Sequence, residues 1–241
     1  MADKNESEKQ FERRREESDP PFSPTENQEN SLQKLSWDVE LDELNRQKLA
    51  RTLHDGLSQT VSALAMRINF TRRMMNSDPD AAQRELEKVE ALTRKTAREI
   101  RYMIFILHPP SVETDGLGGA IESLAEKLDD LFDLEIELQV NRESLKRLPH
   151  NTQRVVFYII SEALDYSRVR NNAHLARVRL DAVAEGMMQV EVESLGVQAT
   201  EEGILLQSPE VDSIRRFTGL LQGSVHVEKA GLLVKAQFPI G

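Results

Sequence analysis

The chain has 241 residues with a formal net charge of −10 at pH 7, and 39% of its residues are hydrophobic. This length supports one or two domains, and the acidic balance argues against a general nucleic-acid-binding surface. The absence of cysteine excludes disulfides, thiolate catalysis and cysteine-based zinc sites. The five histidines are scattered along the chain, so no metal site is expected.

The N-terminal residues 1–31 are predicted to be a disordered polar tail. They mix acidic and basic side chains with three prolines, and such a segment buries too little apolar surface to offset its ordering entropy. A flexible docking tether is the alternative. The start, MADKNESEKQ, lacks the apolar core of a signal peptide, and no apolar run approaches the roughly 18–20 residues that cross a bilayer. A soluble, cytoplasmic protein without a membrane span is therefore expected.

Residues 32–75 are predicted to form one long amphipathic helix. They contain no proline and one glycine, and their apolar residues recur at helical spacing. This stripe consists of Leu41, Leu44, Leu49, Leu53, Leu57, Val61, Leu64 and Ile68. The segment NSDPDAA breaks the helix, and Asp78 or Asp80 can cap the next one.

A second long helix is predicted to run up to His108-Pro109-Pro110, because proline cannot continue a helix. Its inner positions step by alternate threes and fours, which is a heptad seam. These positions are Leu86, Val89, Thr93, Thr96, Ile100, Met103 and Leu107. Two such helices form an antiparallel hairpin over residues 32–110, with half of the seam uncovered. A second copy would cover it, so a dimeric four-helix bundle is expected.

Residues 111–241 are predicted to form a separate α+β domain, an α/β sandwich. Helices are expected near 117–131, 148–167 and 209–222 from their apolar spacing. Period-two alternation predicts strands at 134–140, about 175–183 and 187–194, and a terminal hairpin joined around Gly231.

The segment LARTLHDGLSQTVSAL (49–64) holds the sharpest chemical signal. An imidazole such as that of His54 is a competent nucleophile when a neighbour accepts its proton, and Asp55 is adjacent. Gln59 lies one turn beyond Asp55, so the two side chains share a helix face. Gly56 costs about 1 kcal/mol relative to alanine inside a helix, which suggests a close approach at that point or simple drift.

This stretch resembles the dimerisation and phosphoacceptor hairpin of bacterial sensor histidine kinases of the nitrate-sensor and DesK-like subfamily. Arg51, Leu53, His54, Asp55 and Gln59 are in register with the family motif, whereas Thr52 stands where glutamate is usual. The resemblance extends over roughly 45–241, including the helix exit and linker IRYMIFILHPPSVETDGLGGAIESL.

The resemblance implies specific roles and partners. His54 would be the phosphorylated histidine, and Asp55 would be the base that activates it. Asp55 and Gln59 would position a water for attack on a phosphorylated response-regulator aspartate. A receiver domain would be the partner, with a homodimer or a heterodimer with a related kinase as the assembly.

The second domain resembles the ATP-binding module of the same kinases but departs from its motifs. Tyr166 stands where the family has a Mg²⁺-binding asparagine, and a phenol cannot replace a carboxamide as ligand of a hard cation. Asp165 is expected to point about 100° away from that face. Ser194 replaces the adenine-recognising aspartate, and Gln198 replaces a glycine beside the nucleotide. The nucleotide lid is not recognisable either, so neither ATP nor Mg²⁺ is expected as a cofactor.

Glu162 matches the family's candidate activating carboxylate and is interpreted as a remnant of the nucleotide site or as a solvated helix residue, with the latter favoured. Four arginines, at positions 168, 170, 177 and 179, either bind an acidic partner or balance surface charge, and we favour the second interpretation.

Three hypotheses follow for the function. The first is a two-component signalling protein with a degraded ATP site that exchanges phosphate with a response regulator, or dephosphorylates it, through His54. The second is an active ATP-dependent kinase, which would require ATP and Mg²⁺. The third is a dimeric adaptor without catalysis.

Overall fold

The chain divides into Met1–Asp38 and Val39–Gly241, and only the second unit is described here. The structure, a computed structural model, describes residues 39–50, 52–107, 112, 115–184, 186–197, 208–228, 230 and 232–240. The tail predicted for 1–31 therefore lies outside the described residues, as do His108-Pro109-Pro110 and Gln198.

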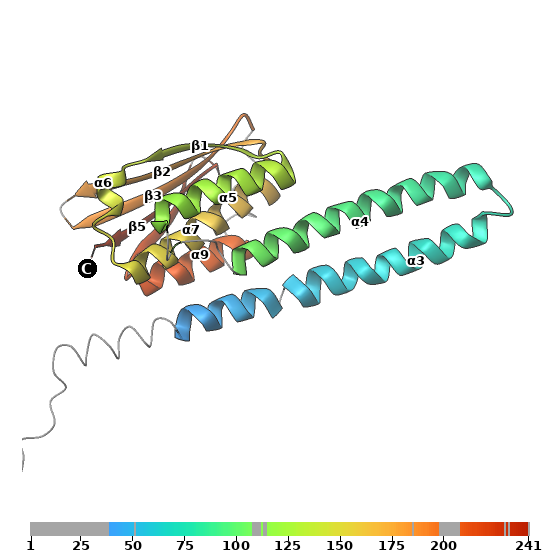
Figure 1. Cartoon of the computed structure of the whole chain (residues 1–241), viewed down its shortest axis with the longest axis horizontal. Helices are drawn as coiled ribbons and strands as arrows, with labels where there is room; N and C mark the ends of the chain where they lie inside the picture. Colours follow the sequence, from blue (N-terminus) through green and yellow to red (C-terminus); the bar gives the residue numbers. More distant parts are fainter. Residues whose placement is uncertain are drawn as a thin grey trace, which may run out of the picture. The chain divides into compact units, whose positions relative to one another are not determined.

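Two long helices form the predicted antiparallel hairpin. Helix α3 spans Ser58–Met74 and helix α4 spans Pro79–Leu107, and they lie side by side (Figure 1). At the turn, the Asp78 carboxylate accepts a hydrogen bond from the backbone N–H of Ala81 at 2.9 Å, which is the expected cap.

The prediction of one continuous α-helix over residues 32–75 is wrong at Thr52–Leu57. Residues 39–50 are helical, but Thr52–Leu57 form a π-helical turn, η1, before α3 begins. Gly56 weakens the α-helical preference here, and the Ser58 hydroxyl donates to the Leu53 carbonyl at 3.1 Å, five residues back. Such π-helical turns often occur at functional sites.

The second half contains one five-stranded sheet in the order β1-β2-β3-β5-β4. The strands are β1 Glu135–Val140, β2 Leu175–Ala184, β3 Met187–Leu195, β4 Ser224–Glu228 and β5 Leu233–Pro239. Strand β1 runs parallel to β2, and the other neighbouring pairs are antiparallel. The α+β fold class predicted from the sequence is confirmed.

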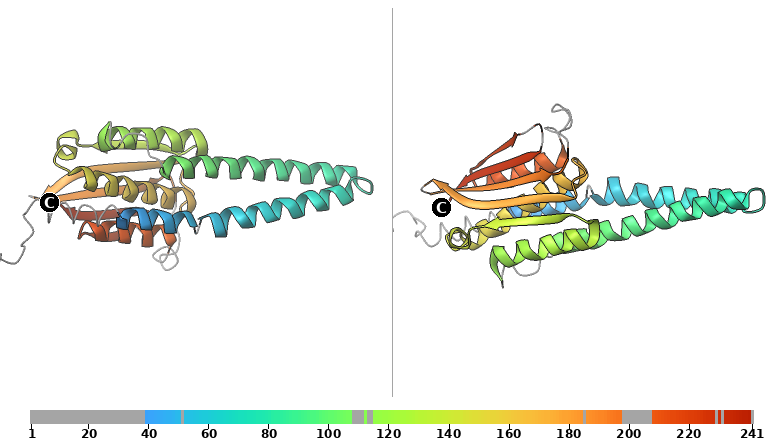
Figure 2. Two further views of the ribbon diagram at one scale, coloured as in Figure 1. Left: turned by 60° about the horizontal axis from the view of Figure 1, so that its bottom comes forward. Right: turned by 90° about the horizontal axis from the view of Figure 1, so that it is seen from above.

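Three helices cover one face of the sheet: α5 Gly116–Phe132, α7 His150–Val169 and α9 Pro209–Leu220 (Figure 2). A short helix α6, Arg142–Leu145, follows β1. Helix α7 is buried along most of its length because it packs between the sheet and its neighbouring helices. None of the described helices is both long and apolar enough for a transmembrane segment.

The opposite face of the sheet carries charged side chains that pair across strands. Arg177 contacts Glu137 at 2.7 Å and Glu193 at 3.5 Å, and Arg179 contacts Glu191 at 3.4 Å. These contacts agree with the interpretation that Arg177 and Arg179 balance surface charge, whereas Arg168 is only 15% exposed and pairs with Glu99 and Asp165. The edge strands β1 and β4 also present acidic residues: Glu135, Glu137 and Glu228.

All three tyrosines of the chain should resist ionisation in the native state. Burial raises the pKa of Tyr102 well above its ordinary value, and burial also raises the pKa of Tyr158 and Tyr166. Each native pKa exceeds the pKa of the unfolded chain, so the native state favours the protonated phenol. The stability that results is fully present below pH 10 and is lost as the pH rises through the native pKa values. Tyrosinate absorbance should therefore stay low at pH 10 in buffer and reach about half of its maximum there in denaturant. Equal absorbance in the two conditions would contradict the burial of the three rings.

Candidate functional site

The predicted phosphoacceptor turn is accessible in the structure. His54 lies on η1 with an exposed side chain, and Gln59 is exposed on the first turn of α3. Asp55 belongs to the same turn as His54, but its side chain lies outside the described part of the structure. The turn thus presents an imidazole and a carboxamide to solvent within six residues of each other.

The backbone around His54 is shaped by side-chain hydroxyls. Thr60 donates to the Gly56 carbonyl at 2.9 Å, and such bonds back to the preceding turn bend helices slightly. A Cβ atom added at Gly56 would meet no described atom within 4 Å. The close approach suggested by Gly56 therefore does not come from the described part of this chain.

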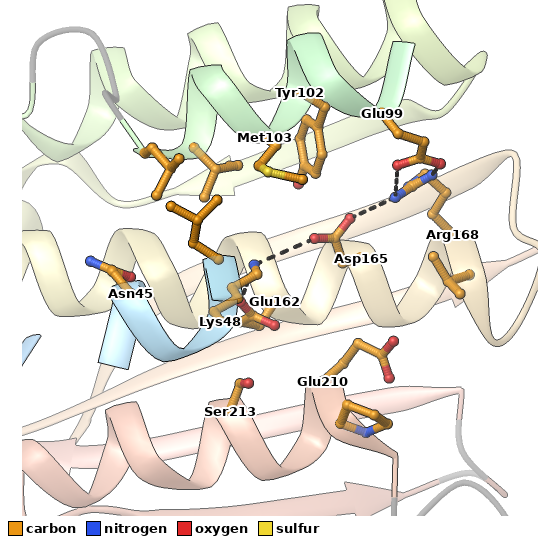
Figure 3. Close-up of a pocket in the computed structure, with 15 residues that line it drawn as sticks. Asn45, Lys48, Glu99, Tyr102, Met103, Glu162, Asp165, Arg168, Glu210 and Ser213 are labelled. Atoms are coloured by element: carbon orange, nitrogen blue, oxygen red, sulfur yellow. Dashed lines mark hydrogen bonds and ion pairs between the residues drawn. The ribbon is translucent and has the colours of Figure 1, made fainter. Parts of the chain in front are cut away.

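A second candidate site is a cavity of about 230 Å³ on the helical side of the sheet domain (Figure 3). Residues 39–50, the end of α4, helix α7 and the start of α9 line it. The charged residues on its wall are Lys48, Glu99, Glu162, Asp165, Arg168 and Glu210, and its apolar side includes Leu49, Met103, Ile106, Leu107 and Val169.

Glu162 is not a solvated helix residue, so the favoured interpretation of this position is wrong. Its side chain is only 3% exposed and forms an ion pair with Lys48, which also lies 3.8 Å from Asp165. Burial raises the pKa of Glu162, an effect that the Lys48 ammonium opposes. Burial opposes the charge of Lys48 as well, but the Glu162 and Asp165 carboxylates outweigh this and raise the pKa of Lys48.

Asp165 was expected to point about 100° away from the helix face of Tyr166, and no observation contradicts this, since Tyr166 is buried in the core while Asp165 lines the cavity. Asp165 lines the same cavity as Glu162, because three residues make nearly one helical turn. Its carboxylate accepts a hydrogen bond from Arg168 at 3.1 Å, and Arg168 reaches Glu99 of α4 at 2.9 Å. Asp165 is therefore the shared carboxylate between two cations (Figure 3).

Tyr166, at the position of the family asparagine, is part of the core. Its side chain is fully buried, and its hydroxyl has no hydrogen-bond partner among the described residues. Burial and the nearby Glu210 carboxylate raise the pKa of Tyr166, although Arg170 opposes them.

Ser194, at the position of the family aspartate, is buried as well. Its hydroxyl accepts a hydrogen bond from the Asn171 side-chain amide at 2.8 Å, just beyond the end of α7. The Ser194 hydroxyl is thus used within the protein. Within the described residues, no group of three histidine or carboxylate side chains lies close enough to hold a metal ion.

Sequence reasoning missed Lys48 and Glu99, which connect the hairpin to the buried charged residues of α7. Lys48 and Glu162 are 114 positions apart, so no local pattern links them. One signal was available: Lys48 follows Leu41 and Leu44 at helical spacing, which places a cation within an otherwise apolar stripe.

Comparison with known proteins agrees with the resemblance seen in the sequence. Residues 45–112 match the family HisKA_3, described as histidine kinase. An uncharacterized sensor-like histidine kinase of Chloroflexus aurantiacus is 29% identical over 161 residues, which cover 66% of this chain and 27% of that protein. The sensor histidine kinase DesK of Bacillus subtilis is 23% identical over 200 residues, covering 83% of this chain and 51% of DesK.

The chain therefore spans between about a quarter and about half of the length of these two relatives. Among solved structures, the blue-light activated histidine kinase EL346 of Erythrobacter litoralis aligns with a TM-score of 0.45 and 14% identity, over 79% of this chain and 59% of that one. The match over the hairpin and the curated relatives support the resemblance of this chain to sensor histidine kinases of the HisKA_3 type.

Proposed function

We propose that this chain acts in two-component signalling as a histidine-kinase relative that works without ATP of its own. Through His54 it exchanges phosphate with the receiver domain of a response regulator, or it dephosphorylates that domain. The observation that carries this proposal is the burial of Tyr166 in the core, at the position where the family places a Mg²⁺-binding carboxamide.

The exposed His54 turn suits phosphoryl transfer. In one direction, an imidazole nitrogen attacks the phosphorus of a receiver aspartyl phosphate, the bond to the aspartate oxygen breaks, and the aspartate leaves as a carboxylate. In hydrolysis, a water held by Asp55 and Gln59 attacks the same phosphorus and releases inorganic phosphate. Both reactions need alignment and charge dispersal more than covalent help, so an accessible, well-placed turn is sufficient.

The sheet domain fits Mg-ATP poorly. A buried phenol supplies no ligand comparable to a carboxamide oxygen, and the Ser194 hydroxyl is already hydrogen-bonded to Asn171. The cavity of about 230 Å³ is smaller than the roughly 300–1,000 Å³ of typical ligand sites. Four carboxylates and only two cations line it, so its described wall disfavours a triphosphate.

The hairpin supports the dimeric assembly of the proposal. Several of its large apolar side chains are exposed, among them Val61, Ile68 and Phe70 on α3 and Leu86 and Ile104 on α4. A second copy, or a related kinase, would cover these residues in a four-helix bundle, since exposed apolar stripes of this kind mark association surfaces.

Incubation with a phosphorylated receiver domain tests the proposal. The protein should shorten the lifetime of the receiver's aspartyl phosphate, and Gln59→Ala should slow that decay by about ten- to a hundredfold, because the attacking water loses its alignment. Receiver binding should be unchanged in this variant. Gln83 is an exposed glutamine on α4, so Gln83→Ala is the matched control. With this variant, the receiver's aspartyl phosphate should decay at the wild-type rate.

The same experiment separates the competing hypotheses. If the receiver phosphate decays at the same rate with and without the protein, and no phosphate reaches His54, the adaptor hypothesis replaces this proposal. If labelled ATP with Mg²⁺ places phosphate on His54 of the purified protein, the active-kinase hypothesis replaces it.

A further inference from the structure

Five charged side chains join three elements around the cavity. Lys48 comes from residues 39–50, Glu99 from α4, and Glu162, Asp165 and Arg168 from α7 (Figure 3). Lys48 pairs with Glu162 and lies 3.8 Å from Asp165, while Arg168 bridges Asp165 and Glu99. Positive and negative groups thus alternate from the first helix of the hairpin, across α7, to the second.

The network is protected from solvent at its centre. The side chains of Glu162, Asp165 and Arg168 are 3%, 12% and 15% exposed. The Arg168 guanidinium also lies 3.9 Å from the centroid of the Phe132 ring, a cation–π contact that fixes its position. A carboxylate as buried as Glu162 is costly unless a cation accompanies it, so the position of Lys48 is coupled to that of α7.

Leu41 of this helix is also buried, and Asn45 hydrogen-bonds to Tyr158, but the other described charged contacts of residues 39–50 with the sheet domain are more exposed. Asp42 lies 3.8 Å from Arg154, and the Asp42 side chain is 75% exposed. Arg216 donates to the Gln47 side chain at 3.5 Å in an exposed contact. Exposed contacts of this kind contribute little, whereas the removal of one member of a buried pair has a large effect. Lys48 is therefore the charged group that binds this helix to α7 most strongly.

We propose that Lys48 is a positioning residue, an internal cation that pairs with the buried carboxylates of α7. It clamps residues 39–50 onto α7 and so orients the His54 turn, which begins four residues later, without a nucleotide. The clamp rests on the contacts above; its effect on His54 chemistry rests on the proposed function.

Hydrogen exchange of the whole chain tests the clamp. In Lys48→Met, the amides of 39–50 and 52–57 should exchange about tenfold faster or more, since this segment opens locally once its anchor is lost. Glu162→Gln, which removes the main partner charge and leaves Lys48 with Asp165 alone, should raise exchange in the same segment. Lys48→Arg retains the cation and should restore protection. Arg94→Met, which breaks the exposed pair with Glu90, is the matched control and should leave this segment unchanged.

The outcomes decide two questions separately. Unchanged exchange of 39–57 in both Lys48→Met and Glu162→Gln would overturn the clamp. Faster exchange, together with a wild-type rate of receiver dephosphorylation in Lys48→Met, would overturn the orientation of His54 by Lys48. If the wild type itself has no effect on the receiver, the proposed function fails, while the exchange data still decide whether the clamp exists.

Discussion

Replacement of His54 by glutamine is expected to abolish the transfer of phosphate from a receiver domain to this chain. Glutamine is similar in size and polarity, but its amide nitrogen is not a nucleophile, so no phosphorylated side chain can form at this position. The expected decrease in label on the chain is about a hundredfold or more. Stability should change little, because the His54 side chain is exposed.

The measurement is the amount of acid-labile label that a receiver carrying labelled phosphate transfers to the chain. His226 on β4 is also exposed, so His226→Gln provides a matched control and should accept as much label as the wild type. Wild-type labelling of His54→Gln would show that another side chain accepts the phosphate and would remove His54 from the reaction.

Two substitutions of Tyr166 should differ strongly in their effect on the free energy of unfolding. Tyr166→Asn restores the family residue but deletes a fully buried ring, and large-to-small changes of this kind cost about 3–5 kcal/mol. Tyr166→Phe removes only a buried hydroxyl that has no hydrogen-bond partner among the described residues, so its effect should lie within about 0.5 kcal/mol of zero or be stabilising.

Urea unfolding of both variants gives these free energies, provided that the slope of the transition is unchanged. We further expect that Tyr166→Asn does not bind Mg-ATP, because Ser194 and the pairing of Glu162 with Lys48 remain. If Tyr166→Asn left the free energy of unfolding unchanged, or bound nucleotide with micromolar affinity, Tyr166 would merely block an otherwise competent site.

The sequence predicted the elements of the fold because periodicity reports which face of an element is buried. The alternation of 134–140 and the apolar spacing of 148–167 correspond to β1 and α7. Helix α4 ends at Leu107, two residues before Pro109 in the sequence. These features depend on neighbours within a few residues of each other.

The cavity could not be predicted in the same way. Periodicity identifies a buried face but not its partner, so the burial of Glu162 depends on Lys48, which is distant in sequence. The π-helical turn at Thr52–Leu57 was missed for a related reason. One additional residue in a helix changes the register of backbone hydrogen bonds without altering the apolar composition that sequence patterns detect.

The charges along the sheet margins limit how two copies can meet. If two β1 margins approached each other, each would present the exposed carboxylate of Glu135, whereas Glu137 is paired with Arg177 and Glu228 of β4 is paired with Lys235. Like-charged borders of this kind disfavour the lateral joining of sheets into larger aggregates. This charge favours the apolar flank of the hairpin over the strand margins as the surface of the proposed dimer.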